Sequence, residues 1–236
     1  MLRVGLTGGL GSGKSTVAAI LRELGAEVTE SDALGRAMME PGHVVYDEIV
    51  RQFGPEVVNP DGRLNRARLA QLAFRGGRLA ELNAIVHPPV IEAQKRWMDE
   101  IVARDPHAIA VVESALIFEV VRDALARGEK NHPLADWRKR IDRVVVVTAP
   151  DDIKVSRYTC RTLEATYGKG PGKPGTPQIG EAIEADARRR LACQVPDAEK
   201  AAQADYVLDN SGDIAALRAQ VLALWPRLRA ESNKSR

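Results

Sequence analysis

The sequence predicts an α/β fold in which helices flank a parallel β-sheet, and three observations support this prediction. Five short runs rich in Val, Ile and Leu alternate with segments of helical periodicity, which is typical of parallel strands joined by helical crossovers. The first run leads directly into a glycine-rich loop and a helical segment. A chain of 236 residues with 44% hydrophobic residues is also long and apolar enough to bury such a sheet.

The strands and the first helix follow from local patterns. We expect strands at residues 2–6, 26–29, 108–112, 143–147 and 206–208. A helix is expected over residues 13–24, because apolar residues recur there at helical spacing and Gly25 ends the pattern. A last helix is expected over residues 213–228. Together these elements predict a nucleotide-binding core made of residues 1–33, 106–150 and 204–230.

Two longer segments interrupt this core. Residues 34–105 have helical character broken by the turn signals "EPGH", "NPDG", "GG" and "HPP", and the stretch is too long for a simple crossover. It predicts an inserted helical subdomain. Residues 151–203 contain two helical stretches around a segment rich in Gly, Pro and Lys, which predicts a lid with a flexible tip.

The charge, cysteine content and apolar runs of the chain argue against several classes of protein. Lys and Arg total 34 against 32 for Asp and Glu, so the formal charge of +2 argues against a general nucleic-acid binder. Cys160 and Cys193 lack the spacing of metal ligands and the density of a disulfide framework, which favours a reducing cytoplasm. No apolar run is long enough to cross a bilayer, and the first residues lack the features of a secretory signal. We expect a cytoplasmic monomer or weak homo-oligomer without nucleic-acid or membrane partners.

The segment "GGLGSGKS", residues 8–15, fits the pattern G-x-x-x-x-G-K-[ST] between a predicted strand and helix. Its backbone N–H groups can bind phosphate oxygens, and the helix start adds partial positive charge. Lys14 can neutralise the β- and γ-phosphates of ATP, and the Ser15 hydroxyl can ligate Mg²⁺. The ATP-binding residues predicted here are Gly8, Gly9, Gly11, Ser12, Gly13, Lys14, Ser15 and Thr16.

Three other interpretations of this loop are weaker. A plain glycine turn at a helix start does not explain the full motif. A dinucleotide fingerprint requires G-x-G-x-x-G, which is absent, and Lys14 stands where that motif needs a glycine. The segments "DALG" and "DNSG" match the D-x-x-G of GTPase switch loops, but no N-K-x-D guanine motif accompanies them. The motif alone leaves a small-molecule kinase and a nucleotide-dependent switch open.

Asp32 is the candidate general base. The first helix covers about 18 Å and the second strand returns about 16 Å, so the chain comes back to the edge of the sheet that carries the glycine loop. A carboxylate at the end of that strand could accept a hydroxyl proton while the oxygen attacks the γ-phosphate. Ser31 or Asp32 could alternatively be the N-cap of the following helix, and the two roles are compatible.

Several motifs together resemble those of the dephospho-coenzyme A kinases. They are "GLTGGLGSGKST" at 5–16, "SDALGRAMMEPG" at 31–42, "LNAIVHPPV" at 82–90, "ALIFE" at 115–119 and "ADYVLDNSGD" at 204–213. The resemblance covers nearly the whole chain. It implies a P-loop kinase fold with a core, a helical coenzyme A subdomain and a lid, with ATP and dephospho-CoA as substrates, Mg²⁺ as cofactor, and ADP and CoA as products.

The resemblance also implies roles at matching positions. Asp32 would be the base for the ribose 3′-hydroxyl, Arg36 would lie near the acceptor, and His87 would face the acceptor pocket. His87 could instead be a polar helix terminator before Pro88. Asn210 in "DNSG" would contact the adenine of ATP.

The lid carries the remaining catalytic candidates. Arg157 and Arg161 share a helix face at a spacing of i and i+4 and could reach the transferring phosphoryl group, although a solvated arginine face would have the same spacing. Arg190 and Gln194 repeat the spacing and match the R-x-x-x-Q of the resembled family. With Asp32 and Lys14, Arg157 and Arg161 make up the predicted catalytic set.

The chain departs from the resembled family at three places. Ala115 replaces a proline in the motif after the third strand, which leaves direct roles of Glu113 and Glu119 open. The segments 125–140 and 164–178 are both longer than expected. We expect both segments to be surface elaborations.

Overall fold

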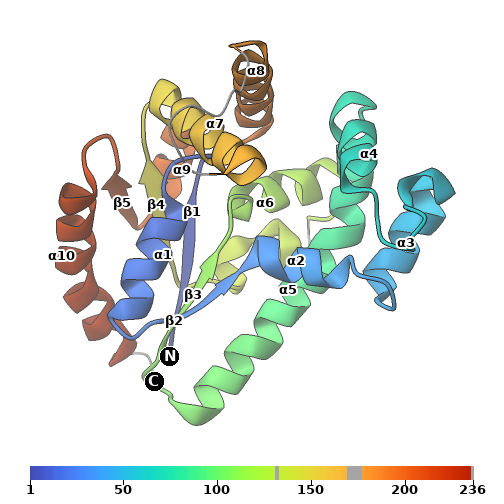
Figure 1. The fold of residues 1–236 in the computed structure, drawn as a ribbon. Helices are drawn as coiled ribbons and strands as arrows, with labels where there is room; N and C mark the ends of the chain where they lie inside the picture. The colour runs from blue at the N-terminus through green and yellow to red at the C-terminus, as the bar shows by residue number, and fades with distance from the viewer. Residues whose placement is uncertain (131–132, 169–176, 235–236) are drawn as a thin grey trace.

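The computed structural model describes residues 1–130, 133–168 and 177–234. Its core is a sheet of five parallel strands in the order β2-β3-β1-β4-β5 (Figure 1). The strands are β1 Leu2–Gly8, β2 Glu27–Glu30, β3 Ile109–Glu113, β4 Arg143–Thr148 and β5 Tyr206–Asp209. All five predicted strands are confirmed, with ends that differ from the prediction by at most two residues.

Helices follow each strand and fill the insertions. The α-helices are α1 Lys14–Glu23, α2 Ser31–Met38, α3 Val44–Phe53, α4 Arg66–Ala70, α5 Leu79–Arg104, α6 Ile117–Ala126, α7 Asp151–Tyr167, α8 Pro177–Cys193, α9 Asp197–Gln203 and α10 Ile214–Ser232. Shorter helical turns are η1 Pro55–Val57, η2 Gln71–Arg75, η3 Pro133–Ala135 and η4 Trp137–Lys139. No helix in the described ranges has the length and hydropathy needed to cross a membrane.

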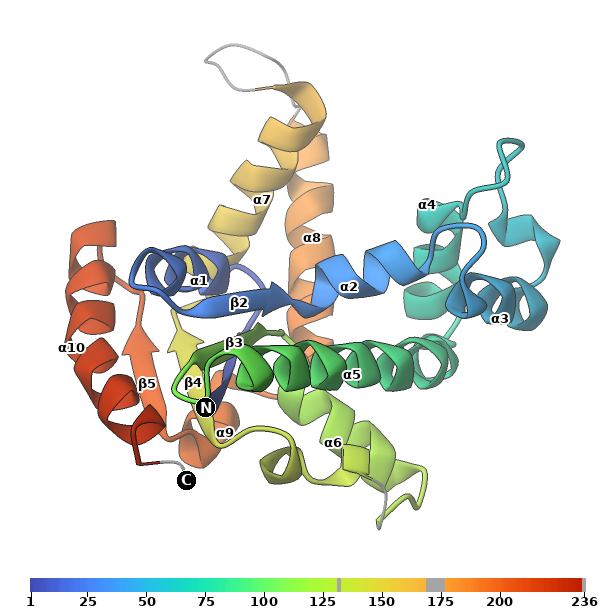
Figure 2. The ribbon, with the colours of Figure 1, turned by 90° about the horizontal axis from the view of Figure 1, so that it is seen from below.

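Helices cover both faces of the sheet, which is why its strands are almost continuously apolar. In β4, Val145 and Val147 point to the face covered by α1 and α10. Val144 and Val146 point to the opposite face, where they pack with residues of α6 and η4. Figure 2 shows α1 and α10 on one side of the strands and α5 and α6 on the other. Both faces are therefore buried, and ligands must bind at the ends of the strands.

The segment between β2 and β3 forms helices α2 to α5, and its outer part has a core of its own. Val45, Ile49 and Phe53 of α3 pack there with Val57 and Leu69, and all five are nearly fully buried. In Figure 1 this group of helices projects to the right of the sheet. The expected helical character of the insertion is confirmed.

The turn predicted at "HPP" is wrong, because α5 continues through Pro88 and Pro89. A proline inside a helix removes one backbone hydrogen bond and crowds the preceding turn. Packing outweighs this local signal: Val86 and Val90 lie close to Gly35, so α2 and α5 are in close contact on both sides of the prolines. His87 is therefore an interior residue of the helix and not a helix terminator.

Helices α7 and α8 lie side by side and extend beyond the carboxyl ends of the strands (Figures 1 and 2). They match the two helical stretches predicted for the lid. The expected flexible tip of the lid falls mainly on residues 169–176, which lie outside the described residues.

Part of the extended segment before β4 is not a surface elaboration, which corrects our expectation for residues 134–137, whereas residues 125–128 are exposed as expected. Leu134, Trp137 and Ile141 are only 3%, 6% and 3% exposed. The ring of Trp137 meets that of Phe118 edge to face, with centroids 5.8 Å apart and planes at 86°. The apolar side chains of this segment complete the hydrophobic core next to α6. The sequence of the segment did not indicate that these side chains would be buried.

Replacing Trp137 with Ala should lower the free energy of unfolding by about 3 to 5 kcal/mol, because the change leaves a cavity against Phe118. Chemical denaturation of both proteins measures the difference. Leu125→Ala is the control, since Leu125 is 46% exposed on the neighbouring α6, and its cost should stay below about 1 kcal/mol. Equal effects of the two changes would contradict a core role for this segment.

Candidate active site

The glycine loop joins β1 to α1 at the carboxyl edge of the sheet. Gly11 and Gly13 have φ angles of +76° and +100°, a region that residues with a side chain rarely adopt. A Cβ at Gly11 would also collide with the carbonyl group of Lys154, and one at Gly13 would collide with the side-chain amide of Asn210. Only glycine fits these positions, so the loop amides can curve around a small space.

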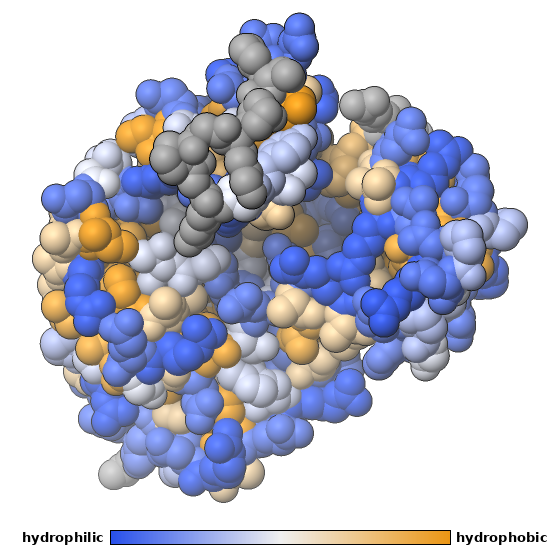
Figure 3. Space-filling model, in the orientation of Figure 1, coloured by the Kyte–Doolittle hydropathy of each residue, from blue (hydrophilic) through white to orange (hydrophobic). Residues whose placement is uncertain are grey.

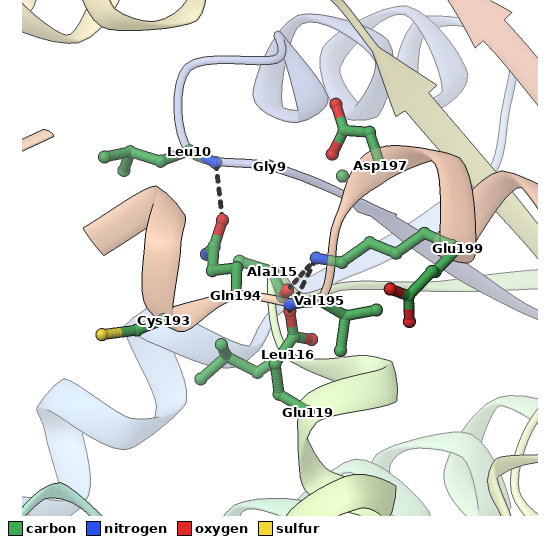
Figure 4. Close-up of polar contacts among 12 residues, drawn as sticks. Gly9, Leu10, Ala115, Leu116, Glu119, Cys193, Gln194, Val195, Asp197 and Glu199 are labelled. Atoms are coloured by element: carbon green, nitrogen blue, oxygen red, sulfur yellow. Dashed lines mark hydrogen bonds and ion pairs between the residues drawn. The ribbon is translucent and has the colours of Figure 1, made fainter. Parts of the chain in front are cut away.

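Polar contacts from distant segments hold this loop in place. The Asn210 side-chain amide donates to the carbonyl oxygen of Ser12 at 2.7 Å. Arg157 Nη1 donates to the carbonyl oxygen of Asn210 at 2.9 Å. On the other side, the Leu10 N–H donates to Gln194 Oε1 at 3.0 Å (Figure 4). The conformation of the loop therefore depends on segments about 180 to 200 residues further along the chain.

A buried ion pair lies behind this contact. Lys200 is fully buried and its Nζ lies 2.8 Å from Glu119 Oε1 and 3.2 Å from the carbonyl oxygen of Ala115 (Figure 4). The same Glu119 oxygen accepts the N–H of Val195 at 2.8 Å. The pair ties α9 and the residue after Gln194 to the start of α6. Glu119 thus has a structural place, and it borders neither of the two cavities described next.

A cavity of about 630 Å³, the loop cavity, lies between the glycine loop and helices α7 and α8. Figure 3 shows the surface hollowed between the side formed by these helices and the side formed by α3 and α4. The basic residues that line the cavity are Lys14, Arg36, Arg157, Arg161 and Arg190. The acidic ones are Glu30, Asp32 and Glu113. The excess of positive charge suits a polyphosphate.

Lys14, the first residue of α1, lies inside this cavity. Its Nζ donates to the carbonyl oxygens of Gly8 and Gly9 at 3.0 and 3.1 Å. Burial lowers the pKa of Lys14 to about 8, and nearby Lys200 and Arg161 also lower it, while Glu113 and Asp32 oppose the shift. The ammonium group is therefore poorly compensated without an anion, and a bound phosphate would stabilise its charge.

Ser15 and Glu113 meet beside Lys14. Ser15 Oγ donates to Glu113 Oε1 at 3.0 Å, and Glu113 Oε2 is buried without a hydrogen-bond partner among the described residues. Burial raises the pKa of Glu113, although the hydrogen bond from Ser15 and the charge of Lys14 act against this shift. A hydroxyl and a carboxylate with a free oxygen fit Mg²⁺, which completes its shell with water and substrate phosphates. No group of three or more His, Cys, Asp or Glu side chains in the described part of the chain is arranged so that these side chains alone could hold a metal ion.

A second cavity of about 360 Å³, the side cavity, lies between α2, α5 and α6. Asp32, Arg36 and Ser114 line both cavities, so the two spaces adjoin at the start of α2. Arg36 Nε donates to the carbonyl oxygen of Asp32 at 3.0 Å, and the Asp32 side chain is exposed. A molecule in the side cavity can therefore present a hydroxyl to Asp32 and to phosphate in the loop cavity.

The capping role considered for Ser31 and Asp32 is wrong. The N-cap of α2 is Glu30, and no side chain caps the helix. Ser31 Oγ instead accepts a hydrogen bond from Gln94 Nε2 at 2.7 Å, which links α2 to α5. The helix begins one residue earlier than a cap at Ser31 requires and two residues earlier than a cap at Asp32 requires, because β2 continues directly into α2. The Asp32 carboxylate is thus not used by the backbone.

His87 lines the side cavity and does not border the loop cavity. Burial lowers the pKa of His87 to about 4, with a partly opposing effect of Asp123. The imidazole is therefore neutral near pH 7 and can offer a hydrogen bond but no charge.

The structure thus brings most of the predicted site residues to one edge of the sheet. Five of them, Gly8, Gly9, Ser12, His87 and Asn210, do not line the loop cavity, although His87 lines the side cavity. Residues that sequence reasoning missed or left open are Glu30, Glu113, Ser114, Tyr158 and Arg140. For Glu113 a signal existed, since it ends a buried strand that pairs with β1. The other four residues reach the cavities through tertiary packing, which local sequence patterns do not reveal.

A parallel sheet of this strand order, with a glycine loop, a lysine and a hydroxyl at the start of the first helix, defines a P-loop nucleotide-binding protein. The side cavity that joins the loop cavity at Asp32 makes it a kinase of this class, because it provides a place for a phosphoryl acceptor.

Comparisons with known proteins specify the class further. The family model of dephospho-CoA kinase matches residues 2–168. Dephospho-CoA kinases of Moorella thermoacetica and Anaeromyxobacter dehalogenans are 34% and 39% identical; the alignments cover 97% and 96% of this chain and 92% of each relative. The chain belongs to the dephospho-CoA kinase family.

Solved structures agree with this assignment. The crystal structure of TT1252 from Thermus thermophilus aligns with a TM-score of 0.65 and 31% identity over 96% of this chain and 97% of that one. A dephospho-CoA kinase from Campylobacter jejuni aligns with a TM-score of 0.58 over 97% of both chains, and at 16% identity it supports the fold alone.

Binding of ATP should take up protons near pH 8, because phosphate restores the charge that Lys14 loses as the pH rises through its pKa of about 8. Isothermal titration calorimetry in buffers of different ionisation enthalpy measures the uptake, which should be about half a proton per ATP at the pKa and should increase from about pH 7 to about pH 9. Lys14→Met should remove this component. An uptake that the variant retains would contradict the assignment to Lys14.

Proposed function

We propose that this protein transfers the γ-phosphoryl group of ATP to the ribose 3′-hydroxyl of 3′-dephospho-CoA, giving CoA and ADP. Membership of the dephospho-CoA kinase family supports this reaction, and a kinase for another small molecule on the same fold is not favoured. The 3′ oxygen forms a bond to the γ-phosphorus while the bond from that phosphorus to the bridging oxygen of ADP breaks.

The observation that carries the proposal is the position of Asp32 where the two cavities meet. ATP in the loop cavity and the acceptor in the side cavity would be adjacent there. In this arrangement the Asp32 carboxylate takes the proton of the 3′-hydroxyl as the oxygen attacks. Arg36, which lines both cavities, and neutral His87 would orient the acceptor.

The phosphates of ATP would be held by the N–H groups of residues 11–16 and by Lys14. Arg157 and Arg161 from α7 would face the transferring phosphoryl group from the opposite wall of the loop cavity and stabilise its charge in the transition state. Asn210 would act indirectly, since its side chain holds the carbonyl oxygen of Ser12. A contact between Asn210 and the adenine of ATP stays a prediction.

Mg²⁺ is part of the proposal. Ser15 Oγ and Glu113 would hold the ion, as their contact and the free Glu113 oxygen suggest. The ion would supply positive charge near the β- and γ-phosphate oxygens. The division into core, acceptor subdomain and lid, the cytoplasmic location and the monomeric or weakly oligomeric state stay predictions.

Acceptor profiling tests the reaction. ADP release is measured with ATP and Mg²⁺ in the presence of dephospho-CoA, AMP, dCMP or shikimate. We expect release with dephospho-CoA to exceed release with the other acceptors. Activity confined to another acceptor would refute the proposed substrate, and hydrolysis independent of any acceptor would favour a nucleotide-dependent switch.

Asp32→Asn should lower kcat by about 10² to 10⁴ and leave ATP affinity almost unchanged, because the amide cannot accept the hydroxyl proton. Steady-state kinetics and ATP titration measure the two quantities. Glu27→Gln, a change of the same kind at an exposed residue of β2, is the control and should have normal kcat. If Asp32→Asn retained normal turnover, Asp32 would not be the base.

A further inference from the structure

The side cavity contains a cation that the proposed reaction does not use. Arg140 follows η4 in the extended segment before β4 and lines the side cavity together with His87 and Ile117. Unlike Arg36, it has no part in the loop cavity. It therefore belongs to the acceptor side of the site alone.

The guanidinium of Arg140 lacks a partner within the described residues. Its Nε and Nη2 atoms are shielded from solvent and form no hydrogen bond there. By contrast, Arg3 directs the same two nitrogens to Asp142 at 3.1 and 2.6 Å, and Arg78 directs them to Glu81 at 3.1 and 2.8 Å. At Arg3 and Arg78 a carboxylate thus binds both Nε and Nη2. At Arg140 the same two nitrogens have no hydrogen-bond partner among the described residues.

An unpaired buried cation reduces stability unless something else compensates it. Burial lowers the pKa of Arg140 to about 10, and Asp136 only partly offsets this effect, so the group still carries its charge near pH 7. The neighbouring His87 is neutral at that pH. Most of the remaining lining of the side cavity is aliphatic, with Val86, Val120 and Ile141 among it. An anion bound in this cavity would therefore meet Arg140 in surroundings that strengthen their attraction.

We propose that Arg140 binds a phosphate of the acceptor's diphosphate. This inference rests on the proposed function, since dephospho-CoA carries its negative charge only on the diphosphate between the adenosine and the pantetheine arm. A guanidinium presents two parallel N–H groups that match phosphate oxygens. Because Nε and Nη2 are covered, the side chain changes its torsion angles when the acceptor binds, as interface side chains commonly do.

This assignment gives the extended segment a function. Leu134 and Trp137 anchor the segment in the core, and Arg140 follows three residues after Trp137 at the wall of the side cavity. The segment that we expected to be a surface elaboration therefore supplies a recognition residue for the acceptor.

The test compares Arg140→Met with the matched control Lys139→Met, which removes the exposed charge of the preceding residue, the last of η4. KM for dephospho-CoA is measured at saturating ATP. Adenosine, which is the same nucleoside without the diphosphate, is measured as an inhibitor that competes with dephospho-CoA. Arg140→Met should raise KM for dephospho-CoA by about 10- to 100-fold and change the inhibition constant of adenosine by less than about twofold. Lys139→Met should leave both unchanged, and Arg140→Lys should recover part of the loss.

Thermal unfolding separates binding from a structural role. Without acceptor, Arg140→Met should be at least as stable as the parent protein, because the change removes an unpaired buried charge. Dephospho-CoA should raise its Tm less than it raises that of the parent. A normal KM for dephospho-CoA, an equal loss for adenosine, or a lower Tm without acceptor would overturn the inference. Absence of CoA formation by the parent protein would instead refute the proposed function.

Discussion

The site depends on one constraint: backbone N–H groups that bind phosphate must all point into the same small space. A loop with this geometry needs residues in left-handed conformations, which Gly11 and Gly13 provide. Glycine alone gives freedom but no fixed shape. The shape comes from Asn210 and Gln194, whose side chains bind the backbone of the loop at Ser12 and Leu10. Permissive residues inside the loop and polar contacts around it are therefore both required.

The same constraint also affects the electrostatics of the site. The loop gathers positive charge at one edge of the sheet, and burial, together with the charges of Lys200 and Arg161, lowers the pKa of Lys14. Behind the loop, Lys200 is paired with Glu119 and Lys154 with Asp197. These two pairs satisfy the buried lysines of the scaffold internally. Lys14 has carbonyl oxygens as hydrogen-bond partners and forms no ion pair with a carboxylate among the described residues, so a phosphate gains most by binding there.

The donor side of the site was predictable because its signals are local. The glycine motif, the strand before it and the helix after it lie within 24 residues, and the return of β2 places Asp32 by simple geometry. The side cavity was harder to predict from the sequence. The continuation of α5 through Pro88 and Pro89 and the burial of Trp137 depend on partners remote in the sequence. Arg140 could not be predicted as a site residue, since nothing in its neighbourhood along the chain indicates that it reaches a cavity.

This division follows from what each half of the site must recognise. Phosphate groups are alike in every nucleotide, so a short motif with fixed backbone geometry is enough to bind them. An acceptor differs from its competitors in shape and in the placement of charge, and a cavity assembled from several helices can match both. The side cavity takes walls from α2, α5 and α6 and from the segment before β4. If the side cavity binds the acceptor as proposed, a change of length in that segment would alter recognition of the acceptor without disturbing the glycine loop, because among the described residues only Asp32, Arg36 and Ser114 line both cavities.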